Sequence, residues 1–545
     1  MPPPPRKRRW PFFVVLGVVI VALLGVAAYA LMGRSEKASA AALAPADSAA
    51  FVQFDLAPSS TQKSRLNALL AKFPAAKDQN TEKVIESLVA KAAEGIGLDY
   101  ASDIKPWLGS KAAAAVIPSA GEPTAVLLVE VKNEAKAKAA LDKARARTQN
   151  QTVVYEFIKG WAVISDRRSD LDAVRKAAGG TKGSLEGAAA YKDAVAKLPA
   201  DRLALAYFDP AKLLGMMPGI LPGMSQGLGM SQGQGVPGMP SMAPSLPGNL
   251  GIPGLDFSSL GNLGVSAVAL RAEENSLVLE SIGTATDMTM SGGEAKLTKA
   301  LPKETLGVLT FFDLKSAITK AESRMATLKM IPGLGSTLEG MKTQLRQTTG
   351  LDFDKDILPW LGGEVSVVFG GIQPPASDAA IPNFQAAIVV QPTDMAAARR
   401  TLEKLKAFAE AGQLPVQDHS SGGVIKYVMT IAGVPEVAAT LDSQRLVIGT
   451  NLAYVERLAA ASGAKLGDDP AYRAALGNAS GETLLQVYLS VGRIKDAVLS
   501  MLGPEAERAY QSRGKEYLDP LDSISVRATR DGKFQHTLVV VRVRK

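Results

Sequence analysis

Hydrophobic positions in the first half of the chain follow two periods, and each period predicts one kind of element. Alternating apolar residues within short β-rich runs at 126–131, 153–157, 161–166 and 203–208 have the period of strands. Apolar residues recur every three or four positions over 133–147 and 170–177, which is the period of helices. The order is therefore strand, helix, two strands, helix, strand. This split βαβ-like order predicts an α+β fold with largely antiparallel sheets.

The same order returns in the second half, and one stretch is nearly identical in both halves. GLDYASDIKPWLG runs from Gly97 to Gly109, and GLDFDKDILPWLG runs from Gly350 to Gly362, 253 positions later. Apolar strands and a helix rich in alanine, lysine and arginine follow each copy. We therefore predict two homologous modules, at residues 44–290 and 298–545.

The repeated stretch has two interpretations. Its glycines can adopt the left-handed conformation that ends a helix, its first aspartate can cap a short turn, and its tryptophan can anchor the turn in a core. Alternatively, two aspartates four positions apart share one helix face and form an acid/base pair or a site for a hard metal. We favour a structural motif without catalytic, cofactor or metal residues. Its members are Gly97, Asp99, Asp103, Pro106, Trp107 and Gly109, and again Gly350, Asp352, Asp356, Pro359, Trp360 and Gly362.

Four apolar strands are followed by a residue that favours the N-cap of a helix. These residues are Asp55, Asp209, Asp313 and Ser490. Aspartate and serine accept hydrogen bonds from the free backbone N–H groups of a first helical turn. We expect four junctions from a strand to a helix at these positions.

The N-terminus predicts a membrane anchor. An uncharged apolar run at 11–32 follows the basic cluster Arg6–Arg9 and is long enough to cross a bilayer as one transmembrane helix. The basic cluster predicts a cytoplasmic tail at 1–10, with a linker at 33–43 and both modules outside the cytoplasm. The alternative is a cleavable signal peptide, since Ala38, Ser39 and Ala40 resemble a cleavage site.

Residues 215–262 interrupt the first module. They contain 12 glycines, 7 prolines and 6 methionines, with Asp256 as the only charged residue, which predicts a long loop. One interpretation is an adaptable apolar contact loop, because methionine side chains are flexible and polarizable. The other is a low-complexity expansion without a role. The candidate contact residues are Met216, Met217, Met224, Met230, Met239 and Met242.

Composition excludes several kinds of chemistry. The chain has no cysteine, so it forms neither disulfides nor thiolate metal sites, and its two histidines lie far apart in sequence. The net charge is +8, but residues 1–40 contribute +5 of it, and the remainder is nearly balanced. A nucleic-acid partner is therefore not expected.

The apolar N-terminal run, the strand PADSAAFVQFDL and above all the two copies of the repeated stretch resemble an uncharacterised bacterial family, domain of unknown function 3352. The resemblance covers about residues 44–545 and implies an envelope protein without an assigned activity. From it and from the residues we expect a non-enzymatic, single-pass membrane-anchored scaffold or binding protein of the cell envelope, with a periplasmic or extracellular body. The alternative is a carrier or sensor of a lipid or another apolar ligand bound between the modules. We expect no cofactor.

Overall fold

A computed structural model describes residues 39–118, 123–147, 153–215, 264–284, 291–327, 334–373, 383–430, 436–477 and 481–544. The chain forms two compact units. Unit 1 comprises residues up to 59 together with 82–269, and unit 2 comprises 60–81 and 270–545. Strand β7 (Ser266–Glu273) crosses from one range to the other. Unit 2 thus takes in a helical segment, 60–81, that lies early in the sequence.

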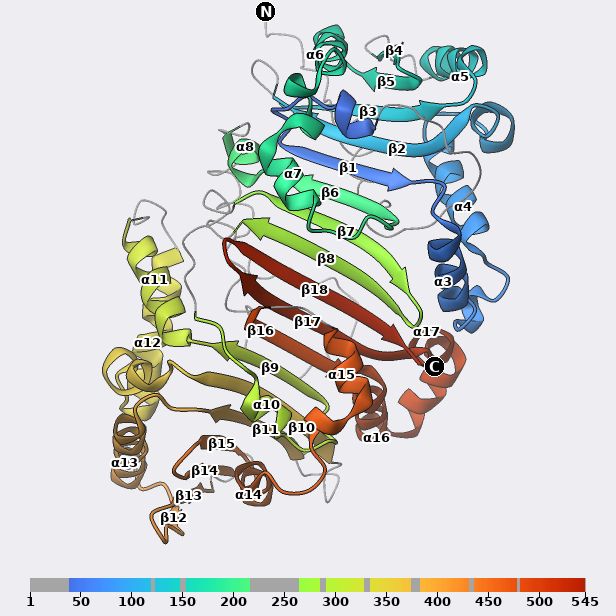
Figure 1. Ribbon diagram of the computed structural model, residues 1–545. Coiled ribbons are helices and arrows are strands. Elements are labelled where there is room, and N and C mark those ends of the chain that lie inside the picture. The colour runs from blue at the N-terminus through green and yellow to red at the C-terminus, as the bar shows by residue number, and fades with distance from the viewer. Residues whose placement is uncertain are drawn as a thin grey trace, which may run out of the picture. The chain divides into compact units, whose positions relative to one another are not determined.

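Unit 1 is built on an antiparallel sheet with the strand order β6-β1-β2-β3-β5-β4 (Figure 1). Strand β5 lies between β3 and β4, as in a split βαβ unit. The strands are β1 (Ala50–Asp55), β2 (Leu108–Ile117), β3 (Thr124–Val131), β4 (Val154–Ile158), β5 (Trp161–Ser165) and β6 (Ala204–Phe208). The helices are α2 (Ala40–Leu43), α4 (Thr81–Glu94), the π-helical turn η2 (Tyr100–Ile104), α5 (Glu134–Arg147), α6 (Arg168–Ala178), η3 (Thr181–Gly183), η4 (Leu185–Gly187), α7 (Ala189–Val195) and α8 (Pro210–Gly215).

Unit 2 contains a longer antiparallel sheet with the order β8-β18-β17-β16-β9-β10-β11-β15-β14-β13-β12. Its strands are β8 (Ser276–Thr284), β9 (Gly307–Phe312), β10 (Glu364–Gln373), β11 (Asn383–Val390), β12 (Val416–Asp418), β13 (Ile425–Met429), β14 (Val437–Leu441), β15 (Leu446–Thr450), β16 (Glu482–Ser490), β17 (Leu521–Asp531) and β18 (Phe534–Val543). Its helices are α3 (Ser60–Leu70), η1 (Pro74–Ala76), α10 (Lys296–Lys299), α11 (Leu314–Thr327), α12 (Leu334–Thr349), η6 (Phe353–Ile357), η7 (Leu358–Trp360), α13 (Met395–Ala411), α14 (Leu452–Ala460), η8 (Leu466–Asp468), α15 (Pro470–Leu476), α16 (Val491–Ala509), η9 (Tyr510–Gly514) and α17 (Lys515–Leu518).

The internal repeat is present in strand order and in side-chain packing. The order β6-β1-β2-β3-β5-β4 of unit 1 corresponds to β16-β9-β10-β11-β15-β14 of unit 2. In unit 1 the rings of Tyr191 and Tyr207 pack edge to face at 5.3 Å, and in unit 2 those of Tyr472 and Tyr488 do so at 5.1 Å. Both pairs join a short helix to the same strand of the repeat, so the two halves share a packing scheme as well as a sequence pattern.

Two helices and a short turn cover one face of the unit 2 sheet. Tyr454, Val455 and Leu458 of α14, Tyr472 and Ala475 of α15, and Leu297 of α10 form one buried cluster with strand residues. The strand residues in this cluster include Val308, Val368, Ala387, Val389 and Tyr488. A second cluster lies on the other face at one end of the sheet, where α13, η6 and η7 pack over the ends of β10 and β11.

The predicted junctions differ in how their caps are made. Asp209 accepts a hydrogen bond from Lys212 N at the start of α8, and Asp313 accepts one from Ser316 N at the start of α11, both at 3.2 Å. Asp55 instead accepts from Ala57 N at 2.9 Å, in a turn before α3. Ser490 is at the N-cap of α16, but its side chain makes no capping hydrogen bond, so that part of the prediction was wrong.

The predicted anchor at 11–32 lies outside the described residues. Within the ranges that the structure describes, no helix has both the length and the apolar character that crossing a membrane requires.

Candidate functional site

In the first copy of the repeated motif, the aspartate side chains accept hydrogen bonds from backbone N–H groups. Gly97 has the left-handed conformation, with φ of 72°, and the chain then enters the π-helical turn η2. Asp99 Oδ1 accepts from Ser102 N at 2.8 Å, and Asp103 Oδ2 accepts from Asp99 N at 2.9 Å. The buried indole of Trp107 donates to the carbonyl oxygen of Asp103 at 2.5 Å. This reciprocal arrangement resembles a capping box.

The second copy repeats these contacts. Gly350 has φ of 69°, Asp352 accepts from the backbone N–H groups of Asp354 and Lys355, and Asp356 Oδ2 accepts from Asp352 N at 2.9 Å. Trp360 Nε1 donates to the carbonyl oxygen of Asp356 at 2.7 Å. The same hydrogen bonds therefore form twice on different sequences.

Each motif is also tied to the helix that follows it along the chain. Lys143 on α5 contacts both carboxylate oxygens of Asp103 at 2.6 Å, and Lys404 on α13 contacts Asp356 Oδ1 at 2.6 Å. These lysines hold the pKa values of Asp103 and Asp356 below their usual range. The carboxylates are thus ionised and already accept hydrogen bonds from the chain itself. This arrangement suits stabilisation of the fold rather than proton transfer.

The remaining motif residues fit the same tight turn. Pro106 and Pro359 each directly precede the buried tryptophan. A Cβ atom on Gly109 would lie 2.6 Å from Glu130, and one on Gly362 would lie 3.0 Å from the side chain of Thr393. In the described part of the chain, no group of three or more histidine, aspartate or glutamate side chains is placed to hold a metal ion. The six candidate methionines of the 215–262 loop lie outside the described residues.

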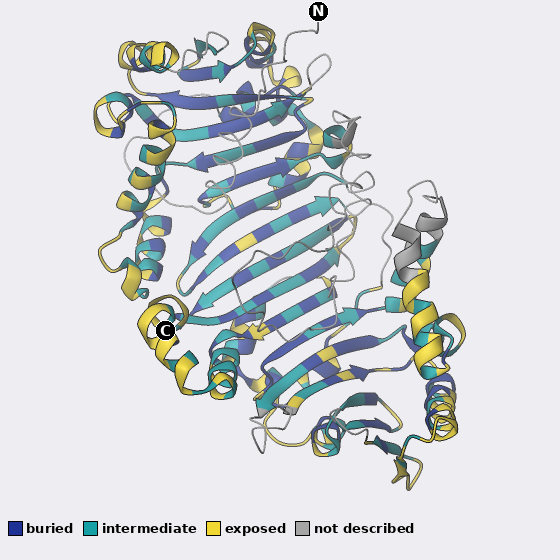
Figure 2. Cartoon of the chain, turned by 180° about the vertical axis from the view of Figure 1, so that it is seen from behind, coloured by how far each residue is buried: buried dark blue, intermediate teal, exposed yellow. Residues whose placement is uncertain are grey.

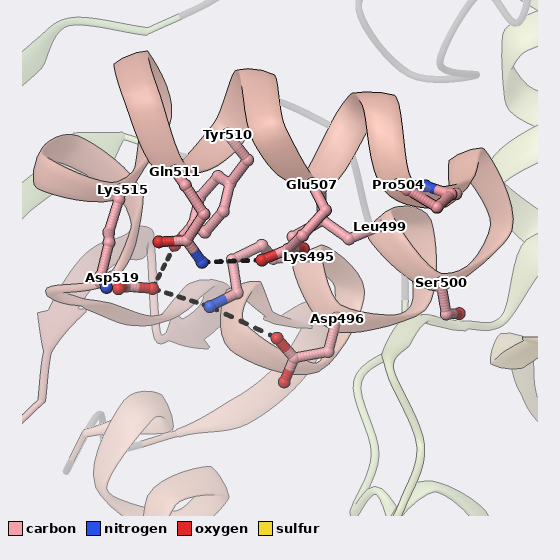
Figure 3. Close-up of a pocket in the computed structure, with 11 residues that line it drawn as sticks. Lys495, Asp496, Leu499, Ser500, Pro504, Glu507, Tyr510, Gln511, Lys515 and Asp519 are labelled. Carbon is pink, nitrogen blue, oxygen red and sulfur yellow. Dashed lines mark hydrogen bonds and ion pairs between the residues drawn. The ribbon is translucent and has the colours of Figure 1, made fainter.

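A charged cleft of about 570 Å³ lies beside α16, η9 and α17 (Figure 3). It forms at a kink, because Gly503 has φ of 76° inside α16 and Pro504 follows it. Lys495 Nζ contacts Asp519 Oδ1 at 2.7 Å and Asp496 at 3.3 Å, and the hydroxyl of Tyr510 also donates to Asp519. These four residues form one connected network.

The electrostatics of this cleft do not favour acid/base chemistry. Burial lowers the pKa of Lys495, but its interactions with Asp519, Tyr510 and Asp496 together outweigh burial and raise the pKa above the usual range. The hydrogen bond from Lys495 lowers the pKa of Asp519, and burial raises the pKa of Tyr510. A general acid or base works best with a pKa near the operating pH, and all three groups are moved away from it. The network therefore braces the kinked helix.

The most unusual surface in unit 2 is the sheet face opposite α14 and α15. One row of paired residues crosses eight adjacent strands, and every member is aliphatic. In order across the sheet, the row is Leu279, Val539, Val526, Val487, Leu309, Val367, Ile388 and Ile448. None of these side chains is buried, and Ile448 at the end of the row packs against the edge of the cluster under α13.

A second row runs beside the first. It consists of Leu277, Val541, Ile524 and Leu489, followed across Gly307 by Phe369. We call the eight residues of the first row and the five apolar side chains of the second the apolar face. Figure 2 shows the buried colour alternating with half-buried and exposed colours along the middle of these strands, as expected when only one face is covered, and no described helix lies over the middle of the sheet in this view.

The exposure of this face is large for residues of its type. Val367 and Ile388 are each 44% exposed, whereas their neighbours Val368 and Val389, on the opposite face of the same strands, are each 1% exposed. Leu279 and Leu489 are 39% and 38% exposed. Contiguous apolar patches of this kind on a protein surface usually mark a binding site.

Sequence reasoning missed this face, although the sequence contains a signal for it. An antiparallel sheet with one solvated face shows polar residues at alternate positions. The stretches VVVRV at 539–543 and AAIVV at 386–390 are instead apolar on both faces. In interior antiparallel strands, this pattern indicates either a second covering layer or a face reserved for a partner.

Comparison with known proteins gives a family and no activity. The family model described as "Protein of unknown function (DUF3352)" matches the chain twice, over residues 13–179 and 172–537. No curated protein and no solved structure matches the chain. The two matches overlap at residues 172–179 and together span nearly the whole chain. The chain therefore belongs to the DUF3352 family of proteins of unknown function.

Proposed function

We propose that the protein is a non-enzymatic binding protein of the cell envelope, whose apolar face in unit 2 takes up an apolar partner. The single observation that carries this proposal is the unbroken aliphatic row across eight strands, none of whose members is buried. Each square ångström of such surface removed from water gains about 25 cal/mol, so an apolar partner gains free energy by covering it.

The pattern of burial within single strands supports a partner rather than chance exposure. Along β16, Tyr488 is buried while Leu489 is exposed, and along β10 the same contrast separates Val368 from Val367. A face that only met water would be expected to have serine, threonine or lysine at these positions. The chain places valine, leucine and isoleucine there instead.

A non-enzymatic role is supported by the polar groups of unit 2. In the cleft at α16, Lys495 and Tyr510 share Asp519 as their hydrogen-bond acceptor. The buried carboxylate of Glu364 accepts from the backbone N–H groups of Leu297 and Thr298 at 2.8 Å. Both arrangements stabilise local structure.

The envelope location rests on the sequence. The apolar run at 11–32 after Arg6–Arg9 would anchor the chain with its N-terminus in the cytoplasm and both units outside. A reporter enzyme that is active only outside the cytoplasm, fused after Lys545, tests this. Activity is expected, and activity from a reporter that works only in the cytoplasm would contradict the location.

Binding at the face is tested with Nile red, a dye that fluoresces in apolar surroundings. The wild type is expected to bind it, and the double variant Val367→Gln, Ile388→Gln to lose most of the signal. Met341→Gln is the matched control, since Met341 is an exposed apolar residue of α12 that lies outside the apolar face. Equal dye binding by all three proteins would overturn the proposal.

A further inference from the structure

We infer that the occupant of the apolar face is the hydrocarbon chain of a membrane phospholipid, lying across the strands along the two aliphatic rows. This inference rests on the proposed function and names the chemical class of the partner. It follows from the composition of the face, from the state of its backbone and from its dimensions.

The composition of the face matches hydrocarbon better than protein. No side chain of either row carries a polar atom, from Leu279 to Ile448 in the first and from Leu277 to Phe369 in the second. Protein interfaces typically form a hydrogen bond for every 100–200 Å² of buried area. These rows offer none, and a hydrocarbon chain requires none.

The backbone under the face is also unavailable. Strands β18, β17, β16, β9, β10 and β11 each pair with a neighbour on both sides. A peptide therefore cannot add itself as a strand at these positions, which is a common way for a sheet to bind a protein. Side-chain contact with apolar groups is what remains.

The dimensions suit a long, thin ligand. Adjacent strands lie about 4.8 Å apart, so a row over eight strands extends roughly 34 Å. Residues two apart on one strand lie about 7 Å apart, which sets the spacing of the two rows. One leaflet of a bilayer is about 15 Å of hydrocarbon, so a phospholipid chain fits within the length of the rows.

At two positions of the first row, unit 2 has larger side chains than the equivalent row of unit 1. In unit 1 the equivalents of Val487 and Val367 are Ala206 and Ala114, which are paired through Val52 in the same register. Both alanines are buried, at 9% and 8% exposure. The other members of this unit 1 row, Val52, Leu127 and Ile164, are branched and half-buried. The two alanines therefore interrupt the row in unit 1, whereas the row in unit 2 is unbroken, which is where we place the lipid.

The test uses the full chain and vesicles of phosphatidylethanolamine and phosphatidylglycerol that contain a trace of pyrene-labelled phospholipid. The wild type is expected to extract the labelled lipid, and Val367→Glu, Ile388→Glu to lose at least about tenfold in affinity, since two charges would be desolvated by hydrocarbon. Met341→Glu is the control with the same change on α12 and should match the wild type. Circular dichroism and melting temperature show that each variant folds.

Acyl-chain length gives a second and independent measurement. Fully burying one methylene group changes affinity roughly fourfold, so half-burial on an open face should give about a twofold gain per added methylene. A series of phospholipids with six to sixteen carbons per chain would report this slope. A flat series would overturn the inference, because headgroup binding does not depend on chain length.

The outcomes separate this inference from the proposed function. Loss of both lipid and Nile red binding in the Val367, Ile388 variant supports both. Nile red binding that depends on the face, without lipid uptake by the wild type, overturns the phospholipid and leaves an apolar partner of another class. Lipid uptake that is unchanged in the variant overturns the face as its site. Absence of binding by either probe in the wild type overturns both.

Discussion

At the scale of single residues, the repeated motif satisfies backbone groups that a tight turn would otherwise leave unpaired. Asp99 and Asp103 accept hydrogen bonds from backbone N–H groups at the start of the turn, and Trp107 donates one to the carbonyl oxygen of Asp103. Burying an unpaired backbone group costs about 1–3 kcal/mol. Pairing these groups therefore gives the three side chains a sufficient structural role, without any chemistry on a substrate. The geometry of the turn thus explains why the same residues occur in both copies.

The tryptophans should contribute the most stability per residue in the motif. Trp107→Ala and Trp360→Ala are each expected to lower the free energy of unfolding by about 3–5 kcal/mol, because each removes a large buried ring and leaves a cavity. Trp→Phe at the same positions keeps most of the volume and loses the indole hydrogen bond to the aspartate carbonyl and, at Trp360, a second one to Thr401 Oγ1. Each hydrogen bond is worth about 1 kcal/mol. Urea denaturation followed by circular dichroism measures both. Equal losses for alanine and phenylalanine would contradict this division.

Acid should destabilise the protein through Asp103 and Asp356. The hydrogen bonds from Lys143 and Lys404 lower the pKa of these carboxyl groups in the folded state below the value of about 3.9 in the unfolded chain. Between those two pKa values the unfolded chain binds more protons, so their stabilising contribution is present above the unfolded pKa and is lost as the pH falls through the folded pKa.

The measurement is the melting temperature from about pH 6 to about pH 2. The variant Asp103→Asn, Asp356→Asn should melt lower than the wild type near pH 6 and approach it at low pH, because its side chains cannot be protonated in that window. Glu339→Gln, at an exposed side chain of α12 outside the motif, should follow the wild type throughout. Parallel curves for the wild type and the double variant would show that the aspartates do not act in this way.

At the scale of elements, the cost of replacing the glycine that follows a helix depends on which side chains lie beside it. Gly97 and Gly350 both have positive φ, yet their surroundings differ. A Cβ atom on Gly97 would meet Arg147 at 3.3 Å, whereas one on Gly350 would meet the ring of Phe408 at 2.4 Å. The two halves therefore use the same backbone conformation under different steric constraints.

Gly97→Ala should cost about 1–2 kcal/mol from the left-handed conformation alone. Gly350→Ala should cost more, because the ring of Phe408 on α13 must also move. A double-mutant cycle with Phe408→Ala isolates this excess. The excess should vanish in the Phe408→Ala background, and its persistence there would place the clash elsewhere.

The sequence predicted the order of elements well because that order is local information. The strand expected at 126–131 is β3 (Thr124–Val131), and the helix expected at 133–147 is α5 (Glu134–Arg147). Strand pairing is not local. Nothing in the alternation of β6 (Ala204–Phe208) shows that β1 and β2 separate it from β3, because the pairing is decided by contacts between distant segments.

The candidate site was missed for a related reason. Val367, Leu309 and Val487 are far apart in sequence and become a row only through strand register. Alternation within one strand indicates that it has two faces and does not indicate which face a helix will cover. Only the run of apolar residues on both faces, as in VVVRV, pointed to an unusual environment.

At the scale of the whole molecule, the two faces of the unit 2 sheet differ in burial, and the proposed function assigns binding to the less buried face. The face under α14 and α15 is closed by a buried cluster that includes Val368, Val389 and Tyr488. The apolar face contributes much less to folding, since its side chains meet water in the absence of a partner. A protein that keeps a solvent-exposed aliphatic surface forgoes the stability that a covering layer would add, which is the expected consequence of reserving that surface for binding.

This division predicts opposite behaviour for neighbouring residues on one strand. Val368→Ala is expected to lower the free energy of unfolding by about 2 kcal/mol, because its methyl groups are lost from a packed core. Val367→Ala, one residue away, should change it by less than about 1 kcal/mol, the scale of strand propensity alone. Val389→Ala and Ile388→Ala should repeat the contrast on β11, where their exposed fractions are 1% and 44%.

Urea denaturation of the four variants measures these losses, and Nile red titration measures binding. The variants at 367 and 388 should lose dye affinity while keeping stability, and those at 368 and 389 should lose stability while the remaining folded protein keeps its dye affinity. Similar stability losses at both faces would show that the apolar face is covered in solution, and would remove the physical basis for a binding surface there.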